Sequence, residues 1–120
     1  MATETAPAPD CVFCRVVAGD IPAEVVHETT TTVAFRDLDP QAPSHVLVVP
    51  RVHQPDAAAL AGAEPAVLVD LVTSAAAVAE QEGLGAGYRM VLNTGAAANQ
   101  TVFHVHLHVL GGRAMGWPPG

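Results

Sequence analysis

The chain of 120 residues contains no lysine, and its five arginines are outnumbered by twelve acidic residues, which gives a formal net charge of −7. Proteins that bind the phosphate backbone of DNA or RNA need many cationic side chains to neutralise the phosphates. The charge balance therefore argues against a nucleic-acid partner. It does not exclude a single nucleotide, since one pocket needs no basic surface.

The sequence also lacks an uninterrupted apolar segment of membrane-spanning length. Its longest apolar stretch, residues 66–79, is broken by Asp70, Thr73 and Ser74. Residues 1–10 have neither the basic region nor the apolar core of a signal peptide. We therefore expect a soluble, cytoplasmic protein with no membrane partner. Only two cysteines are present, separated by two residues, and reduced thiols are expected because a disulfide there would close a very small loop.

The order of apolar and turn-forming segments predicts a single domain over residues 11–120, with an irregular C-terminal tail over residues 111–120. The polar, proline-rich residues 1–10 are expected to be disordered. The first two of five predicted strands form a hairpin, and short connections favour an antiparallel meander. The fold class is therefore α+β, with one long helix and a short N-terminal helix on the sheet. The predicted strands are residues 24–28, 32–37, 45–50, 88–93 and 102–110.

One long helix is predicted to begin at Pro65, which suits the first helical position, and to stop at Gly83. Its apolar residues recur at spacings of three and four, so they form one stripe that should pack on the sheet. The segment before it, residues 53–65, is expected to be a short turn. The stripe consists of Leu68, Leu71, Val72, Ala75, Val78 and Ala79.

Three histidines, His104, His106 and His108, occupy every second position of an apolar run. On a strand, alternate side chains share a face, so the three imidazoles would lie together and the intervening residues would face the core. Two chemistries suit this pattern. The three imidazoles could bind one catalytic zinc with an open position for water. Alternatively, one imidazole could be a nucleophile towards phosphorus, oriented by its neighbours. The residues expected in the core are Phe103, Val105, Leu107 and Val109.

The segment "HVHLHVL" has the pattern His-x-His-x-His-x-x, with hydrophobic residues at x, and resembles the motif of the histidine-triad (HIT) family of nucleotide hydrolases and transferases. From about Cys11 to the C-terminus, the chain is similar to the Hint branch of that family in the order and spacing of three segments. The third histidine separates it from the transferase branch, which carries glutamine there, and so favours hydrolysis. The three segments are "FRDLDPQAPSHVLVVPRVHQ", "GYRMVLNTG" and "HVHLHVLGGRAMGWPPG".

The resemblance implies a HIT-like fold and a purine nucleoside phosphoramidase, which cleaves the P–N bond of an adenosine 5′-phosphoramidate to AMP and an amine. It implies that His106 attacks phosphorus and that water then hydrolyses the nucleotidyl-histidine intermediate. Neutral imidazole suits this role when an acceptor holds its other ring nitrogen. The resemblance also implies that His108 binds phosphate oxygens or transfers protons, and that His45 meets the triad from the neighbouring strand.

For the nucleotide, the resemblance places the ribose hydroxyls on Asp37 and the sugar and base against Leu38. The alternative for Asp37 is an ordinary turn aspartate before Pro40. Hint proteins usually have glycine and serine where this chain has Asn99 and Thr101, which leaves the leaving-group preference open. The residues that match positions around the phosphate are Asn93, Asn99, Gln100 and Thr101.

The pair Cys11 and Cys14 resembles the Cys-x-x-Cys pair of some bacterial HIT proteins, in which the two thiolates bind a structural zinc with two histidines. The resemblance implies that His53 and His104 complete the site here. A Cys2His2 set satisfies the tetrahedral preference of zinc and closes the site to water. Two packed, reduced thiols or a redox role are the alternatives.

Trp117 is the only tryptophan, and it lies in a tail rich in proline and glycine. The resemblance implies a homodimer in which Trp117 shapes the leaving-group pocket of the other subunit. A frayed tail is the alternative. Three alternative functions also remain: a dinucleoside polyphosphate hydrolase, a non-catalytic nucleotide-binding adaptor, and a zinc hydrolase that uses the triad as ligands.

Overall fold

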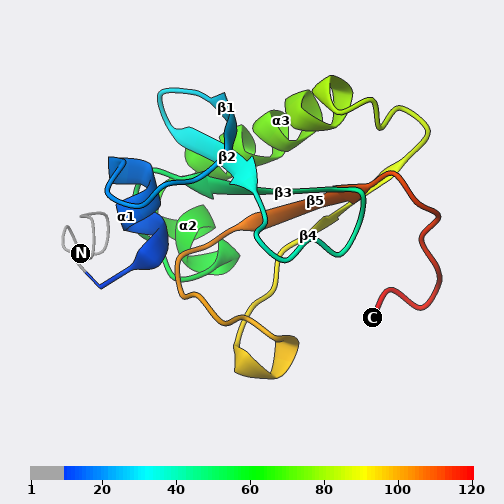
Figure 1. Ribbon diagram of the computed structural model, residues 1–120. Helices are drawn as coiled ribbons and strands as arrows, with labels where there is room; N and C mark the ends of the chain where they lie inside the picture. The colour runs from blue at the N-terminus through cyan, green and yellow to red at the C-terminus, as the bar shows by residue number, and fades with distance from the viewer. Residues whose placement is uncertain (1–9) are drawn as a thin grey trace.

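The computed structural model describes residues 10–120, which form a five-stranded antiparallel sheet with helices on both faces (Figure 1). The α+β prediction is confirmed. The disordered tail predicted for residues 1–10 lies, apart from Asp10, outside the described residues. The strands are β1 (Val25–Glu28), β2 (Thr32–Arg36), β3 (Ser44–Pro50), β4 (Tyr88–Val91) and β5 (Leu107–Gly111). The helices are α1 (Val12–Ala18), α2 (Ala57–Ala63), α3 (Pro65–Gln81) and the 3-10 helix η2 (Ala96–Ala98).

The strand order is β1-β2-β3-β5-β4, so the predicted meander is wrong for the last two strands. Strand β5 pairs with β3, where Val109 faces Val46, and β4 pairs on the far side of β5 at the sheet edge. The chain passes through α2 and α3 between β3 and β4, and this long connection does not force the two strands to be neighbours. The more buried strand, β5, takes the central position.

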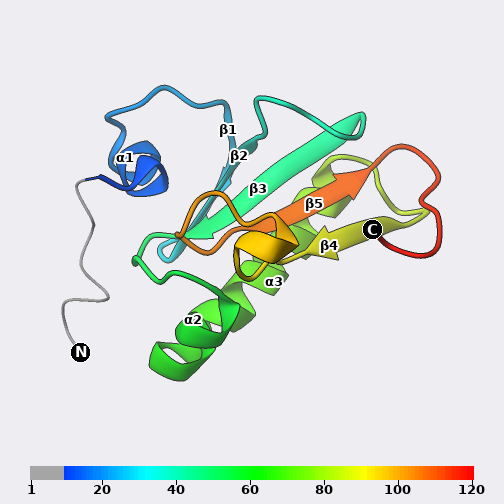
Figure 2. The ribbon, with the colours of Figure 1, turned by 90° about the horizontal axis from the view of Figure 1, so that it is seen from below.

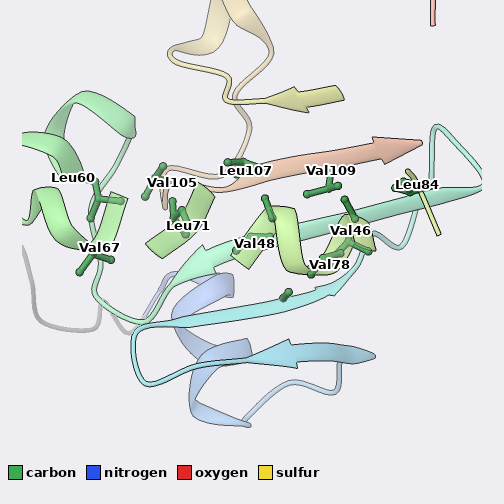
Figure 3. Close-up of a cluster of buried hydrophobic side chains, with 13 residues drawn as sticks. Val46, Val48, Leu60, Val67, Leu71, Val78, Leu84, Val105, Leu107 and Val109 are labelled. Carbon is green, nitrogen blue, oxygen red and sulfur yellow. The ribbon is translucent and has the colours of Figure 1, made fainter. Parts of the chain in front are cut away.

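Side-chain alternation along β3 divides the core between the two faces of the sheet. Val46 and Val48 point to the face covered by α2 and α3, where the larger apolar cluster lies (Figure 3). Leu47 and Val49 point to the opposite face, where they pack with Phe13 of α1. Figure 2 shows α1 and α3 on opposite sides of the sheet. The α1 face has the smaller cluster, and it also carries the polar side chains described below.

Helix α3 begins at Pro65 as predicted and ends at Gln81, two residues before Gly83, whose φ of 75° relieves the turn that follows. The predicted apolar stripe is wrong at Val72, which is 44% exposed. Ser74 is buried instead, because its hydroxyl lies 2.8 Å from that of Thr32 in the sheet. Within residues 10–120, no helix is long and apolar enough to cross a membrane. The buried residues of α3 are Val67, Leu71, Ser74, Ala75, Val78 and Ala79.

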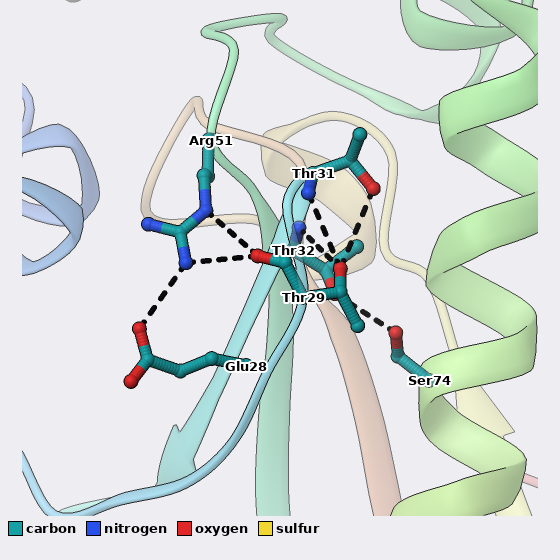
Figure 4. A network of polar contacts seen from close by, with 6 residues as sticks. All are labelled: Glu28, Thr29, Thr31, Thr32, Arg51 and Ser74. Carbon is teal, nitrogen blue, oxygen red and sulfur yellow. Dashed lines mark hydrogen bonds and ion pairs between the residues drawn. The ribbon is translucent and has the colours of Figure 1, made fainter.

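The segment 53–65 is more than the predicted turn, since it contains helix α2. Asp56 caps that helix by accepting a hydrogen bond of 2.9 Å from the N–H of Ala59. The β1–β2 turn is also tied down by polar contacts (Figure 4). Arg51 donates to the carbonyl of Thr29 at 2.9 Å, and Thr32 joins this turn to α3 through Ser74. The hairpin is thereby fixed to the helix that packs beneath it.

Candidate functional site

Strand β5 begins only at Leu107, so His104 and His106 lie in the bent segment that leads into it. Val105, Leu107 and Val109 are buried in the larger core cluster as predicted. Phe103 is 52% exposed, and the prediction that it faces the core is wrong. The strict alternation fails there because the segment is bent, with Val105 donating its N–H to the carbonyl of Gln54 at 2.8 Å.

The structure brings together the four residues predicted to bind zinc. Their donor atoms all lie within 4.8 Å of one another. The Sγ of Cys11 is 3.3 Å from Nδ1 of His104, and the Sγ of Cys14 is 3.4 Å from Nδ1 of His53. The two histidine Nδ1 atoms are 3.2 Å apart. Cys14 and His104 are buried, whereas Cys11 and His53 are half-buried.

The chemistry of this cluster fits a tetrahedral zinc ion. Ordinary Zn–S and Zn–N bond lengths place neighbouring ligand atoms of a tetrahedral site about 3.3 Å (N–N) to about 3.8 Å (S–S) apart, and the N–N and S–N spacings found here are close to this. The Nε2–H of His104 donates to the carbonyl of Pro50 at 2.9 Å, so the lone pair on Nδ1 faces the cluster. Burial lowers the pKa of His104 to about 4, which keeps this ring neutral. The backbone N–H of Cys14 donates to the Sγ of Cys11 at 3.3 Å, as suits a thiolate ligand.

His106, which is 8% exposed, has one ring nitrogen committed to the backbone. Its Nδ1 lies 2.9 Å from the carbonyl oxygen of His104. A carbonyl oxygen only accepts, so Nδ1 carries the hydrogen and Nε2 keeps its lone pair. This is the tautomer that an imidazole nucleophile needs. The ring of Phe13 packs edge-on against it, with a centroid distance of 5.0 Å.

A chain of hydrogen bonds also defines the tautomers of His45 and His108. The backbone N–H of Gln41 donates to Nδ1 of His45 at 3.0 Å, so the hydrogen of this neutral ring is on Nε2. That Nε2 lies 2.9 Å from Nδ1 of His108, which accepts. The hydrogen of His108 is therefore on its Nε2, a buried atom that has no hydrogen-bond partner within residues 10–120. His108 thus offers one donor beside the cavity described below.

Both of these rings are held neutral. Burial lowers the pKa of His108 to about 4, and the neighbouring His106 and His45 add to the effect. Burial also lowers the pKa of His45, although the carboxylates of Asp37 and Asp39 oppose this. The nearer carboxylate oxygen, Oδ2 of Asp37, is 3.4 Å from Nε2 of His45. Neutral rings with defined tautomers act as directional donors and acceptors rather than as diffuse positive charges.

A cavity of about 260 Å³ opens on the α1 face of the sheet, beside His106 and His108. It is lined on one side by apolar residues that include Phe13 and Val16 of α1. Leu38 lies at its edge and is 99% exposed. The predicted nucleotide residues that line the cavity are Asp37, Leu38, Thr101, His106 and His108.

Asn93, Asn99 and Gln100 are not among the residues that line this cavity. The buried amide of Gln100 organises its own loop instead. Its Nε2 donates to the carbonyl of Pro55 at 2.6 Å, and its Oε1 accepts from the N–H of Gly95 at 2.9 Å. Asn99 has a φ of 65°, so this position needs the left-handed conformation that asparagine tolerates better than most residues. Gln100 is therefore a scaffold of the loop that presents Thr101.

Two contributors to the site have no signal in the sequence motifs. The backbone N–H of Gln41 acts through an atom that all residues except proline possess. Helix α1 supplies part of the cavity wall, for which the only hint in the sequence is the apolar character of Val12, Phe13 and Val16.

The predicted pocket residue Trp117 lies in the C-terminal tail and is 85% exposed. Arg89 of β4 holds this tail by donating to the carbonyl of Gly116 at 2.8 Å.

Two other metal arrangements do not fit. The three triad histidines do not converge on one point, because His104 belongs to the cysteine cluster and His108 to a separate group with Asp37 and His45. This argues against a zinc hydrolase with the triad as ligands. In the second group, Nδ1 of His45 already accepts from the Gln41 N–H. A metal on its Nε2 would therefore require a ring stripped of both hydrogens.

The chain is a small α+β protein with an antiparallel sheet. One face of the sheet carries a cavity lined by an imidazole of fixed tautomer, and a cluster of four metal-ligand atoms lies where strand β5 begins. These features are typical of a histidine-triad protein. The sequence profile of the HIT domain matches residues 18–115. The chain belongs to the HIT family.

Similar proteins support this assignment. The chain is 50% identical over 113 residues to an uncharacterised HIT-like protein of Synechococcus elongatus, covering 92% of this chain and 97% of the relative. It is 46% identical over 112 residues to a 14 kDa zinc-binding protein of Zea mays, covering 91% and 87%. The crystal structure of a HIT family hydrolase from Legionella pneumophila superposes with a TM-score of 0.88 at 43% identity, covering 92% of this chain and 100% of that one.

Proposed function

We propose that the chain is a hydrolase that cleaves the P–N bond of purine nucleoside 5′-phosphoramidates, releasing AMP and an amine. The observation that carries the proposal is the hydrogen bond from Nδ1–H of His106 to the carbonyl of His104, because it leaves Nε2 as a nucleophile in the cavity. The description of solved relatives as HIT family hydrolases supports the same class of reaction.

The reaction proceeds in two displacements at phosphorus. The Nε2 lone pair of His106 forms a bond to phosphorus while the P–N bond breaks, and the amine leaves with that electron pair and takes up a proton from solvent. Water then attacks phosphorus, the bond to Nε2 breaks with its electron pair returning to His106, and AMP is released while the proton of the attacking water passes to solvent. His108 donates its Nε2–H to a phosphate oxygen, which stabilises the charge that develops there.

The nucleotide is held by residues at the cavity edge. Asp37 accepts hydrogen bonds from the ribose hydroxyls. Its Oδ1 already accepts from the N–H of Asp39 at 2.8 Å, which orients the carboxylate, and a carboxylate has further acceptor sites for the hydroxyls. Leu38 packs against the sugar and base, and Thr101 offers its hydroxyl to the phosphate. Asn93 and Asn99 remain predicted contributors of the phosphate surroundings.

Incubation with an adenosine 5′-phosphoramidate tests the proposal. The wild type should release AMP, and His106→Ala should reduce kcat/KM about 1,000-fold or more, since it removes the nucleophile. His27→Ala is the matched control, because His27 lies on β1 outside both histidine clusters. AMP binding without turnover would contradict hydrolysis and favour an adaptor. Faster cleavage of a diadenosine polyphosphate would favour a dinucleoside polyphosphate hydrolase.

We propose that Cys11, Cys14, His53 and His104 bind one structural zinc ion. The close spacing of their donor atoms and the name of the maize relative, a zinc-binding protein, support this. When bound, zinc would supply a cross-link between the N-terminal segment and the strand entry, with no position left for substrate. Elemental analysis of protein without an added metal-binding tag should find about one zinc per chain. Its absence after refolding with zinc would contradict the proposal.

We also propose a homodimer joined at the β4 edge of the sheet. Tyr88 and Met90 of β4 are exposed, at 37% and 42%, and an open strand edge with apolar side chains favours pairing with a second chain. The Arg89 contact keeps the tail with Trp117 beside this edge. Trp117 would then reach the leaving-group side of the other subunit's cavity. A cytoplasmic location remains a prediction.

A further inference from the structure

Helix α1 contributes to both sites at once. Cys11 caps the helix and Cys14 lies in its first turn, and both belong to the four-donor cluster. Val12, Phe13 and Val16 of the same helix line the cavity. A displacement of α1 would therefore disturb the metal ligands and the cavity wall together.

Phe13 forms the physical link between the two sites. It lies between the two cysteines in the sequence, and its ring packs edge-on against His104 at a centroid distance of 6.0 Å and against His106 at 5.0 Å. On the sheet side it contacts Phe35, at 5.5 Å. The side chain next to the proposed nucleophile thus packs on one predicted metal ligand, His104, and directly precedes another, Cys14, in the sequence.

We infer that Cys11 and Cys14, when they share a metal ion with His53 and His104, position helix α1 as the wall of the nucleotide cavity, so that metal occupancy sets nucleotide affinity. The inference rests on the proposed function for the identity of the nucleotide. Metal–thiolate bonds restrain α1 strongly, whereas thiols are weak hydrogen-bond donors. Loss of the metal therefore loosens the contact of Phe13 and Val16 with the cavity.

The first experiment compares zinc-loaded and chelator-treated protein in AMP titrations by calorimetry and in limited proteolysis by trypsin. The chain has no lysine, so trypsin cuts only after its five arginines, and Arg15 lies exposed in α1. Metal removal should weaken AMP binding about 10-fold or more and expose the bond after Arg15 before those in the sheet. A Cys11→Ser, Cys14→Ser double variant should bind AMP weakly whether or not the chelator is present.

The second experiment needs no metal removal and uses two neighbouring valines of α1. Val16 and Val17 are both half-buried and both pack on the cluster of the α1 face, but only Val16 lines the cavity. In zinc-loaded protein, Val16→Ala should weaken AMP binding about 3- to 10-fold, and Val17→Ala less than about twofold. Arg15 should stay protected in both variants.

The outcomes separate this inference from the proposed function. If zinc-loaded wild type does not bind AMP, the proposed function fails and the inference fails with it. If metal removal exposes Arg15 while AMP affinity is unchanged, the metal is a staple only and the inference alone is wrong. Equal effects of Val16→Ala and Val17→Ala would likewise contradict it. Where metal removal unfolds the whole chain, the valine pair still tests the part of the inference that makes α1 the wall of the nucleotide cavity.

Discussion

At the scale of single residues, the order of hydrogen-bond donors from Gln41 through His45 to His108 determines which atom of His108 can donate to a ligand. His45 contributes no atom to the cavity lining, yet it selects the tautomer of His108. His45 is therefore a positioning residue. Its role differs from that of His106, whose tautomer is selected separately by the carbonyl of His104.

Replacement of His45 by alanine should lower kcat about 10- to 100-fold with little change in KM, because His108 loses the donor that holds its Nε2–H towards the cavity. His45→Gln should recover part of the loss, since a carboxamide both donates and accepts. Nitrogen NMR shifts of His108 provide a direct readout, with a single tautomer in the wild type and a mixture in His45→Ala. An unchanged tautomer in His45→Ala would contradict the role assigned to His45.

Part of the pH dependence of stability follows from the lowered pKa of His108, about 4 against an ordinary 6.5. Below pH 6.5 the unfolded chain binds a proton that the folded ring rejects, so this contribution to stability is complete above pH 6.5 and declines as the pH falls towards 4. Between pH 7 and pH 5, the wild type should lose about 1 kcal/mol more than His108→Gln, a value reduced for solvent screening. Urea unfolding at both pH values measures this. Equal losses would show that His108 is not the group responsible.

Among the site residues, those with distinctive chemistry were predictable from the sequence. A Cys-x-x-Cys pair and alternating histidines are typical of metal sites and of catalytic sites. Their resemblance to a family motif predicted that His53 and His104 join the two cysteines as metal ligands. Gln100 was expected beside the phosphate, but its amide forms hydrogen bonds with the backbone of Pro55 and Gly95. These partners become known only from the folded loop. The contribution of Gln41 could not be predicted, since any residue but proline provides the same N–H.

At the scale of elements, helix α3 and strands β3 and β5 were predictable because their apolar residues recur at the spacing of a helix or a strand. The position of β5 between β3 and β4 was not, because local sequence does not specify which strands become neighbours after a long helical connection. The boundary of β5 was also missed. The bend before Leu107 depends on tertiary contacts such as the bond from Val105 to the carbonyl of Gln54.

Two adjacent residues of α3 give a direct test of which helix face is buried. Leu71 is 0% exposed, so Leu71→Ala should lower the free energy of unfolding by about 3 kcal/mol through the cavity it leaves. Val72→Ala, at an exposed site, should change it by less than about 0.5 kcal/mol. Chemical denaturation of both variants makes the comparison. Similar losses of unfolding free energy from both variants would contradict the exposure of Val72 and support the apolar stripe predicted from the sequence.

At the scale of the whole molecule, the proposed dimer uses the β4 edge of the sheet and leaves the β1 edge free of the partner. Light scattering should give twice the chain mass of 12.3 kDa. Met90→Glu on β4 should shift the protein towards monomer, because it places like charges at a twofold contact. Val25→Glu, at an equally exposed position on the opposite edge strand, is the matched control and should leave the dimer intact. A monomeric wild type would contradict the proposed dimer.

The main-chain origin of the Gln41 contact has a consequence for how this site tolerates change. Alanine scanning would pass over position 41, because every such variant keeps the N–H that His45 accepts, while Arg113 still donates to the carbonyl of the same residue at 3.1 Å. Proline is the one replacement that removes the donor. The hydrogen bond from position 41 to His45 therefore survives nearly all point substitutions at that position, and its importance would escape any survey that judges residues by their side chains.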